Sequence, residues 1–182
     1  MTESDIEAVS TVRVLGWQFA YAGLMPQAHL DAMSIEEDAA RRRERFGSGR
    51  AVNLVAERDG KVVGWASFGP CRDEDAGPGD GELYALYVHP GQLSTGTGRA
   101  LMEQVLEQAS GLGHSALRLW VLERNARARR FYEQAGFAPD GSEEPYEVDG
   151  TPVPEVRYAR RLTPQPELSA VAQPTTGPYF SL

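Results

Sequence analysis

Residues 82–102 read ELYALYVHPGQLSTGTGRALM, and this stretch decides how the chain folds. Its first part, residues 82–88, is rich in aromatic and aliphatic side chains, as is typical of a short buried strand. Pro90 ends that strand, because proline has no N–H to donate to a neighbouring strand. After a loop that contains two glycines, Leu101 and Val105 begin an apolar stripe at helical spacing. The stretch therefore predicts a strand, a glycine-containing turn and a helix.

A turn of this kind places backbone N–H groups at the positive end of a helix dipole, which favours binding of an anion, most often phosphate. Two well-known phosphate loops do not match these residues. The P-loop requires a lysine directly after its second glycine, whereas Arg99 follows Gly98. The dinucleotide-binding fingerprint requires glycine or alanine at the position of Leu101.

A third pattern fits better. The segment from Leu93 to Gly98 resembles motif A of the GNAT superfamily of acetyl-CoA-dependent N-acetyltransferases, which is written (Q/R)-x-x-G-x-(G/A). The chain departs from this pattern at its first position, where Leu93 replaces glutamine or arginine. The resemblance implies that backbone N–H groups of the loop hold the pyrophosphate of CoA: those of Ser94, Thr95, Gly96, Thr97, Gly98 and Arg99. The alternative interpretation is a tight turn before a helix, with no ligand.

Residues 117–137, LRLWVLERNARARRFYEQAGF, resemble motif B of the same superfamily. Asn125 is a good N-cap for a short helix that carries Tyr132, and Gly136 is a typical helix stop. The family pattern also expects the phenylalanine found at position 137. The two motifs occur in the family's order, and the resemblance covers residues 51–161.

The resemblance implies roles for particular residues. Leu86, Tyr87 and Val88 would pair their backbone with the pantetheine arm, and one of their N–H groups would stabilise the oxyanion. Tyr132 matches the general acid, and its ordinary pKa of ~10 is close enough to the ~8.5 of a thiol for proton donation to sulfur. Asn125 would cap its helix and also bond the cofactor. The alternatives are a core tyrosine and a cap alone.

Neither motif supplies the general base that would accept a proton from the amine. Some family members carry an acid on the strand of motif B, but the inward side chains there are Trp120 and Leu122. We expect Glu82 to be the base, because it shares a strand face with Leu86 and Val88 and can face the same cleft. An exposed carboxylate at a strand end is an equally good interpretation of Glu82. Some family members use a water chain and no single base.

Composition narrows the class of protein. The chain has 182 residues and is 41% hydrophobic, which fits one soluble domain. Its net charge of −8 argues against nucleic acid or an anionic membrane as a partner and favours a cationic substrate such as an amine. The single cysteine, Cys71, fits a cytoplasmic protein without disulfides. No apolar run could span a bilayer, and the histidines show no zinc spacing, so we expect neither a membrane nor a metal.

The resemblance predicts an α/β (α+β) fold, with a mixed, mostly antiparallel central sheet flanked by helices. The family's first strand has no room in this chain, because a capping box of Ser4 and Glu7 starts a helix almost at once. We therefore expect residues 53–57 to form the first edge of the sheet. That edge should be open to solvent or covered by the C-terminal tail or a partner chain, which allows a homodimer.

Turn residues divide the rest of the chain. Asp59-Gly60 and Asp149-Gly150 predict two tight hairpin turns. Residues 69–81 are rich in glycine and acidic residues and predict a long flexible loop. We assign residues 1–162 to one GNAT domain and residues 163–182, which are rich in proline, to a tail.

These features predict an enzyme that moves an acetyl group from acetyl-CoA to a primary amine of a small molecule or peptide, by direct attack in a ternary complex. A non-catalytic acyl-CoA-binding module of the same fold is the alternative; it would keep the phosphate loop but would not need Tyr132. A succinyl donor would require a basic residue near the thioester, which the sequence does not identify. The acceptor stays open among antibiotics, polyamines, amino acids and protein termini.

Overall fold

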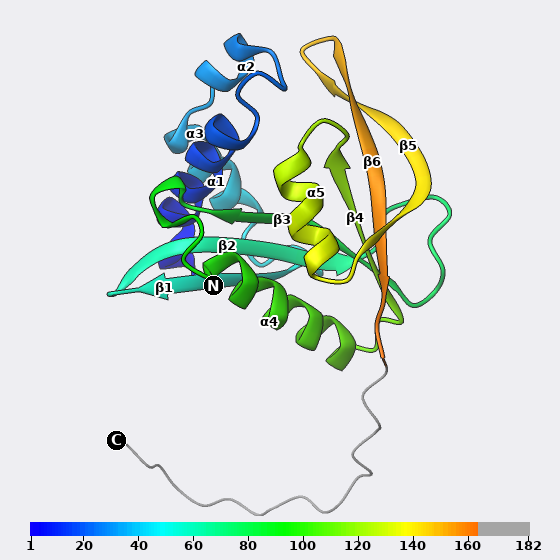
Figure 1. The fold of residues 1–182 in the computed structure, drawn as a ribbon. Coiled ribbons are helices and arrows are strands. Elements are labelled where there is room, and N and C mark those ends of the chain that lie inside the picture. Colours follow the sequence, from blue (N-terminus) through cyan, green and yellow to red (C-terminus); the bar gives the residue numbers. More distant parts are fainter. Residues whose placement is uncertain (164–182) are drawn as a thin grey trace, which may run out of the picture.

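The computed structural model describes residues 1–163, so the predicted tail lies outside the described residues except for Thr163 (Figure 1). In chain order the elements are η1 (Glu3–Asp5), α1 (Ile6–Ala20), α2 (Gln27–Asp31), α3 (Ile35–Arg45), β1 (Val52–Arg58), β2 (Lys61–Pro70), β3 (Asp80–Val88), η2 (Pro90–Gln92), α4 (Thr97–Gly111), β4 (Ala116–Leu122), α5 (Ala126–Gln134), β5 (Ala138–Val148) and β6 (Thr151–Arg161). The strands form one six-stranded sheet in the order β1-β2-β3-β4-β6-β5. Every pair is antiparallel except β3 with β4, which confirms the predicted fold class.

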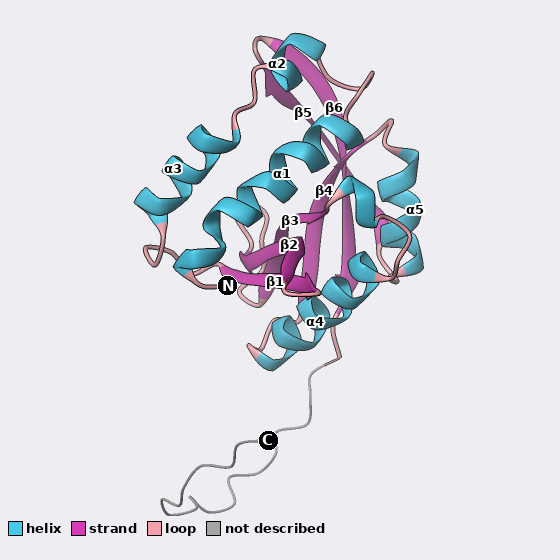
Figure 2. Cartoon of the chain, turned by 90° about the vertical axis from the view of Figure 1, so that its left-hand side faces the viewer, coloured by secondary structure: helices cyan, strands magenta, loops and turns pink. Residues whose placement is uncertain are grey.

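Helices cover both faces of the sheet (Figure 2). On one face, Val9 and Val12 of α1 pack with Trp65 of β2. On the other face, α4 and α5 pack on β4 through a larger cluster that includes Leu101 and Val105, the residues of the predicted apolar stripe. None of the helices in residues 1–163 is long and apolar enough to cross a membrane.

The chain starts with a helical turn and not with a strand, as predicted, and β1 is the first edge of the sheet. The predicted capping box was placed two residues too late. Thr2 and Asp5 form the box, with the Thr2 N–H donating to Asp5 Oδ2 at 2.6 Å. Ser4 lies inside the 3-10 turn, where its backbone is already helical, and its hydroxyl bonds to that of Thr2 at 2.8 Å.

Strand β3 contains a bulge that changes which side chains share a face. Opposite β2, Ser67 pairs with Ala85 and Phe68 pairs with Leu83, so Tyr84 is one residue too many. After the bulge, Leu86 and Val88 lie on the same side as Leu83, packed against the α4 cluster. Ala85 and Tyr87 face α1 instead.

Strands β3 and β4 separate soon after they meet. They pair only from Asp80 opposite Ala116 to Glu82 opposite Arg118. Beyond this point β3 keeps its partner β2 on one side, but on the other side its backbone has no neighbouring strand. This gap between β3 and β4 is where the candidate site lies.

Two hairpins follow the prediction. Asp59 and Gly60, at the turn between β1 and β2, have φ values of 51° and 71°, and Asp149 and Gly150, between β5 and β6, have 48° and 76°. Positive φ at both central residues is the type I′ geometry that fits the twist of paired strands. The β5–β6 hairpin reaches α2, where His29 Nδ1 lies 2.9 Å from Asp149 Oδ2 (Figure 1).

The loop between β2 and β3, which was predicted to be flexible, is instead fixed by ion pairs to arginines of β4 and β6. Arg157 of β6 contacts Asp73 at 2.9 Å and Asp75 at 2.6 Å. Arg118 of β4 contacts Asp75 at 2.8 Å and Asp80 at 2.7 Å. The sequence shows the acidic residues of the loop but not the arginines, because these lie far along the chain on strands that reach the loop only in the folded sheet.

Candidate active site

A cleft of about 410 Å³ lies where β3 and β4 separate. Its walls come from the end of α1, from β3, from the loop before α4, from Trp120 of β4 and from α5. Most of the site residues predicted from the sequence line it: Leu86, Tyr87, Val88, Ser94, Gly96, Gly98, Arg99, Asn125 and Tyr132. Three predicted residues are not part of the lining: Glu82, Thr95 and Thr97.

One end of the cleft is the N-terminus of α4. Gly96 is the N-cap residue with φ 88°, a left-handed conformation in which glycine is favoured. The first regular helical bond runs from the Ala100 N–H to the Gly96 carbonyl at 3.0 Å. The N–H groups of Thr97, Gly98 and Arg99 therefore have no acceptor within the helix, and together with the helix dipole they favour an anion.

Thr95 and Thr97 hold the shape of this loop from outside the cleft. Their hydroxyls lie 3.0 Å apart, and the Thr95 hydroxyl also donates to the Gln92 carbonyl at 2.7 Å. The guanidinium of Arg99 is exposed and donates to Glu103 at 2.8 Å. The predicted anion site thus consists of backbone groups, with these side chains supporting the loop.

Tyr132 lies on α5, which begins where the sequence predicted. The Asn125 side chain accepts a hydrogen bond from the Ala128 N–H at 3.1 Å and so caps the helix. The Tyr132 ring packs edge-on against Phe131 and Phe137, with ring centroids 5.4 and 6.1 Å away. Among residues 1–163 its hydroxyl has no recorded hydrogen bond, so it is available to a group in the cleft.

Burial raises the pKa of Tyr132 above its usual value, and the neighbouring Tyr87 adds to the increase. The phenol therefore carries its proton throughout the neutral range. A sulfur anion that forms in the same desolvated cleft is also made more basic. Tyr132 is thus protonated and lies in the wall of the cleft.

The other end of the cleft is aromatic, and the sequence analysis did not identify it. The Tyr21 and Tyr87 hydroxyls lie 3.2 Å apart, and Trp17 packs edge-on against Tyr21 with ring centroids 5.0 Å away. Burial raises the pKa of both tyrosines. The sequence did offer a signal for this end of the cleft: several aromatic residues lie around the predicted end of the first helix. One of them, Phe19, also lines the cleft.

Glu82 does not lie where the sequence analysis placed it. The prediction that it shares a strand face with Leu86 and Val88 is wrong, because the bulge at Tyr84 shifts the alternation of side chains by one residue. The Glu82 carboxylate is buried and accepts bonds from the Arg72 backbone N–H and Nε, both at 3.0 Å, and from Nη2. Its role as a base stays a prediction, and this ion pair gives it no support.

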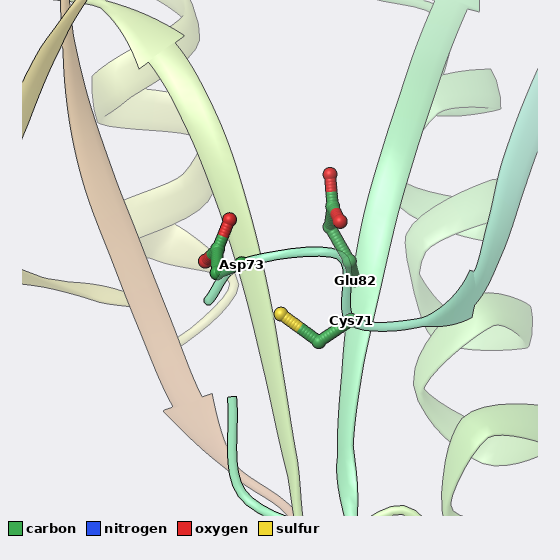
Figure 3. Close-up of side chains that lie close together, drawn as sticks. All are labelled: Cys71, Asp73 and Glu82. Atoms are coloured by element: carbon green, nitrogen blue, oxygen red, sulfur yellow. The ribbon is translucent and has the colours of Figure 1, made fainter. Parts of the chain in front are cut away.

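Glu82 also belongs to a cluster with Cys71 and Asp73 (Figure 3). One ligand-type atom of each residue lies within 4.8 Å of the others. Arginines already neutralise the acidic members: Arg72 binds Glu82, and Arg157 binds Asp73 at 2.9 Å. Asp73 also accepts from the Trp120 ring N–H at 3.0 Å. The cluster is therefore an ion-paired support beneath the cleft.

Comparison with known proteins gives the family. Residues 17–137 match the model of the acetyltransferase (GNAT) family, a span that contains both motifs and every residue of the cleft lining except Gly16. The chain belongs to the GNAT acetyltransferase family. Family membership makes it an acyltransferase. A similar GNAT protein of Bacillus subtilis, the uncharacterized N-acetyltransferase YuaI, is 32% identical over 168 residues, which cover 92% of this chain and 91% of that protein.

Solved GNAT structures have the same fold. The PaiA N-acetyltransferase of Thermoplasma acidophilum, solved in complex with coenzyme A, aligns with a TM-score of 0.66 at 19% identity and covers 88% of this chain and 95% of that chain. The putative acetyltransferase YncA of Salmonella typhimurium, solved with acetyl-CoA, aligns with a TM-score of 0.64 at 24% identity, covering 93% and 94%.

Proposed function

We propose that this GNAT protein transfers an acetyl group from acetyl-CoA to a primary amine, and that both substrates occupy the cleft between β3 and β4 at the same time. One observation carries the proposal. A single cleft joins the N-terminus of α4, the Tyr132 hydroxyl and the aromatic end at Tyr21 and Tyr87. An anion site, a proton donor and a separate compartment for a second substrate are what such a transfer requires.

The residues of the cleft fit CoA. The N–H groups at the start of α4 favour the pyrophosphate. Beyond Glu82, β3 has no strand beside it on the β4 side, so backbone groups of Leu86 to Val88 can pair with the amides of the pantetheine arm. Two of the solved GNAT neighbours hold CoA or acetyl-CoA, which supports the same co-substrate for this chain.

Acetyl-CoA supplies an activated thioester when it is bound. The β3 backbone orients it, and an N–H group there can donate to the thioester oxygen as negative charge develops on it. Tyr132 gives its proton to the departing sulfur. The aromatic end of the cleft excludes water, which protects the thioester from hydrolysis.

Release of free thiol from acetyl-CoA in the presence of a panel of primary amines tests the proposal. Thiol release that requires an amine, with one acetylated amine formed for each thiol, is the expected result. Tight binding of acetyl-CoA without turnover of any amine would favour the acyl-CoA-binding module instead.

A further inference from the structure

Glu155 of β6 is not among the residues that line the cleft, but it lies on the face of the sheet against which Trp17, Tyr21 and Tyr87 pack. It pairs with Leu122 of β4 on one side and with Glu144 of β5 on the other. Directly paired residues of antiparallel strands point to the same face of the sheet. Leu122 belongs to the cluster that Trp17 of α1 covers, so this face looks toward α1 and α2.

Among residues 1–163, no cation forms an ion pair with the Glu155 carboxylate. No hydrogen bond or ion pair to it is recorded within residues 1–163. The next side chain on the same face of β6 is Arg157, which is already engaged by Asp73, Asp75 and Asp140. Its cross-strand neighbour Glu144 has the same charge, which is unfavourable. A partly buried carboxylate is stabilised by a positive partner, and here a bound ligand could supply that positive charge.

The carboxylate is also within electrostatic reach of the cleft. Burial is the main reason that the pKa values of Tyr21 and Tyr87 are raised, and the charge of Glu155 adds to the increase at both. Both tyrosines line the cleft. The charge of Glu155 thus reaches Tyr21 at the end of α1 and Tyr87 of β3, while Glu144 pairs with it from β5 and Arg157 is next along β6.

These surroundings tune the carboxylate for proton transfer. Burial, with a further contribution from the charge of Glu144, raises the pKa of Glu155 to about 7. A group whose pKa lies near the working pH can both accept and release a proton efficiently.

We propose that Glu155 binds the ammonium group of the acceptor and takes one proton from it; the inference rests on the proposed function. An N–H bond of the ammonium breaks, and Glu155 becomes a carboxylic acid. The lone pair of the amine forms the C–N bond while the C–S bond breaks, and sulfur takes the proton of Tyr132. The nitrogen then gives a second proton, through water, to the deprotonated Tyr132, and Glu155 releases the proton that it took to solvent.

The charges at this end of the cleft also indicate the class of acceptor. Glu144 and Glu155 stand side by side, and Arg118 and Arg157 on their face are engaged by aspartates. Arg127, which also lines the cleft, lies over the Phe19 ring, with Cζ 5.8 Å from the ring centroid. A carboxylate next to the reacting amine would be repelled by this pair. The acceptor is therefore a cationic primary amine whose neighbouring groups are neutral or positive, and not a free α-amino acid.

Four variants test the assignment: Glu155→Gln, Glu144→Gln, Glu143→Gln and Glu82→Gln. In the parent, kcat/KM for the amine should rise through pH about 7 as Glu155 ionises. Glu155→Gln should lower kcat/KM at neutral pH by ~10²-fold and abolish this rise. Glu144→Gln should move the rise to lower pH, because a repelling charge is gone, and a merely structural role would not produce that shift. Glu143→Gln, on the neighbouring position of β5 whose partner is Val156, is the matched control and should resemble the parent.

Calorimetry with CoA accompanies each variant, and the affinity should be unchanged. Loss of CoA binding in Glu155→Gln would show that the residue is structural and would overturn the inference. An unchanged pH profile in Glu155→Gln, or loss of the rise in Glu82→Gln instead, would also overturn it while leaving the proposed function intact. If the parent acetylates no amine at all, the proposed function fails, and the inference fails with it.

Alaninamide and alanine test the acceptor class, because alaninamide lacks the carboxylate next to the amine; since alaninamide is also the weaker base, the two rates are compared per neutral amine present. The parent should use alaninamide with a kcat/KM at least about tenfold higher, since like charges repel strongly at a desolvated site. Equal use of the two, or a preference for alanine, would overturn the assignment of the acceptor class.

Discussion

At the scale of single residues, Tyr132 offers a direct test of the chemistry. Tyr132→Phe removes only the hydroxyl, and the ring can still pack against Phe131 and Phe137. We expect kcat to fall by ~10²-fold or more with little change in CoA affinity, because a general acid is lost while the binding surface stays. Thiol release and calorimetry measure the two effects. Tyr146→Phe, outside the cleft lining, is the control, and equal turnover by Tyr132→Phe and this control would contradict the acid role.

Glu155 makes a second prediction, on stability. Its pKa is about 7 in the folded chain, against ~4.3 for an ordinary glutamate, so the native state holds the proton more tightly than the unfolded state. The parent should therefore lose free energy of unfolding as the pH rises from about 4 to about 7. Glu155→Gln avoids this loss and should be more stable than the parent by about 2 kcal/mol at pH 8, but equal to it near pH 4.

Urea unfolding of the parent and the variant at both pH values checks this prediction. Glu143→Gln is again the control: it keeps Glu155, so its stability should follow the pH dependence of the parent. A stability difference that stays constant with pH would mean that the Glu155 carboxylate is not perturbed by burial.

Residues differed in how far the sequence could place them. Asn125 was placed correctly as the N-cap of α5 and Tyr132 correctly on that helix, because the cap, the helix and its glycine stop are local signals. Glu82 was misplaced, because a bulge leaves no mark in the alternation of β3. Glu155 could not be identified, because its importance depends on the pairing of β6 with β4 and β5, and neither the pairing nor the missing cation is visible in a linear sequence.

At the scale of elements, the turn into α4 carries the cofactor prediction. Gly96→Glu puts a negative charge and a strained left-handed residue at the N-terminus of the helix, where the phosphates should sit. We expect CoA binding to be lost. Nothing lies within 4 Å of a Cβ added at this position, so the fold should persist.

Gly96→Asn separates charge from backbone strain. Asparagine tolerates the left-handed conformation better than most residues and adds no charge, so this variant should retain CoA binding that Gly96→Glu loses. Calorimetric titration with CoA measures both variants. Parent-like binding by Gly96→Glu would mean that the anion site is elsewhere.

Local signals also explain which elements could be predicted. The two Asp-Gly turns and the helix after the glycine loop follow from a few neighbouring residues, and all three form where expected. The gap between β3 and β4 could not be derived from local pattern, because both segments have ordinary strand sequences. Their separation is a property of the whole sheet.

At the scale of the whole molecule, the ion pairs of the 71–80 segment join the two halves of the sheet. Strands β3 and β4 share only three residue pairs, so β1–β3 and β4–β6 have little backbone contact with each other. Arg157 and Arg118 reach from β6 and β4 to the aspartates that follow β2, and so link the halves beneath the cleft. The two halves of the sheet therefore stay joined below the cleft although β3 and β4 separate around it.

This arrangement predicts that Arg157 matters for both stability and binding. Arg157→Gln leaves Asp73, Asp75 and Asp140 without their shared cation, and Asp73 and Asp140 are partly buried. We expect a loss of about 2 kcal/mol in the free energy of unfolding, below the scale for a fully buried pair because Asp75 is 60% exposed. CoA affinity should fall with it, since the floor of the cleft is no longer fixed. Arg45→Gln removes an equal charge from the exposed surface of α3 and should change neither quantity. Urea unfolding and calorimetry on both variants decide the matter: a parent-like Arg157→Gln would mean that the short β3–β4 pairing and the packed helices hold the two halves together without the ion pairs.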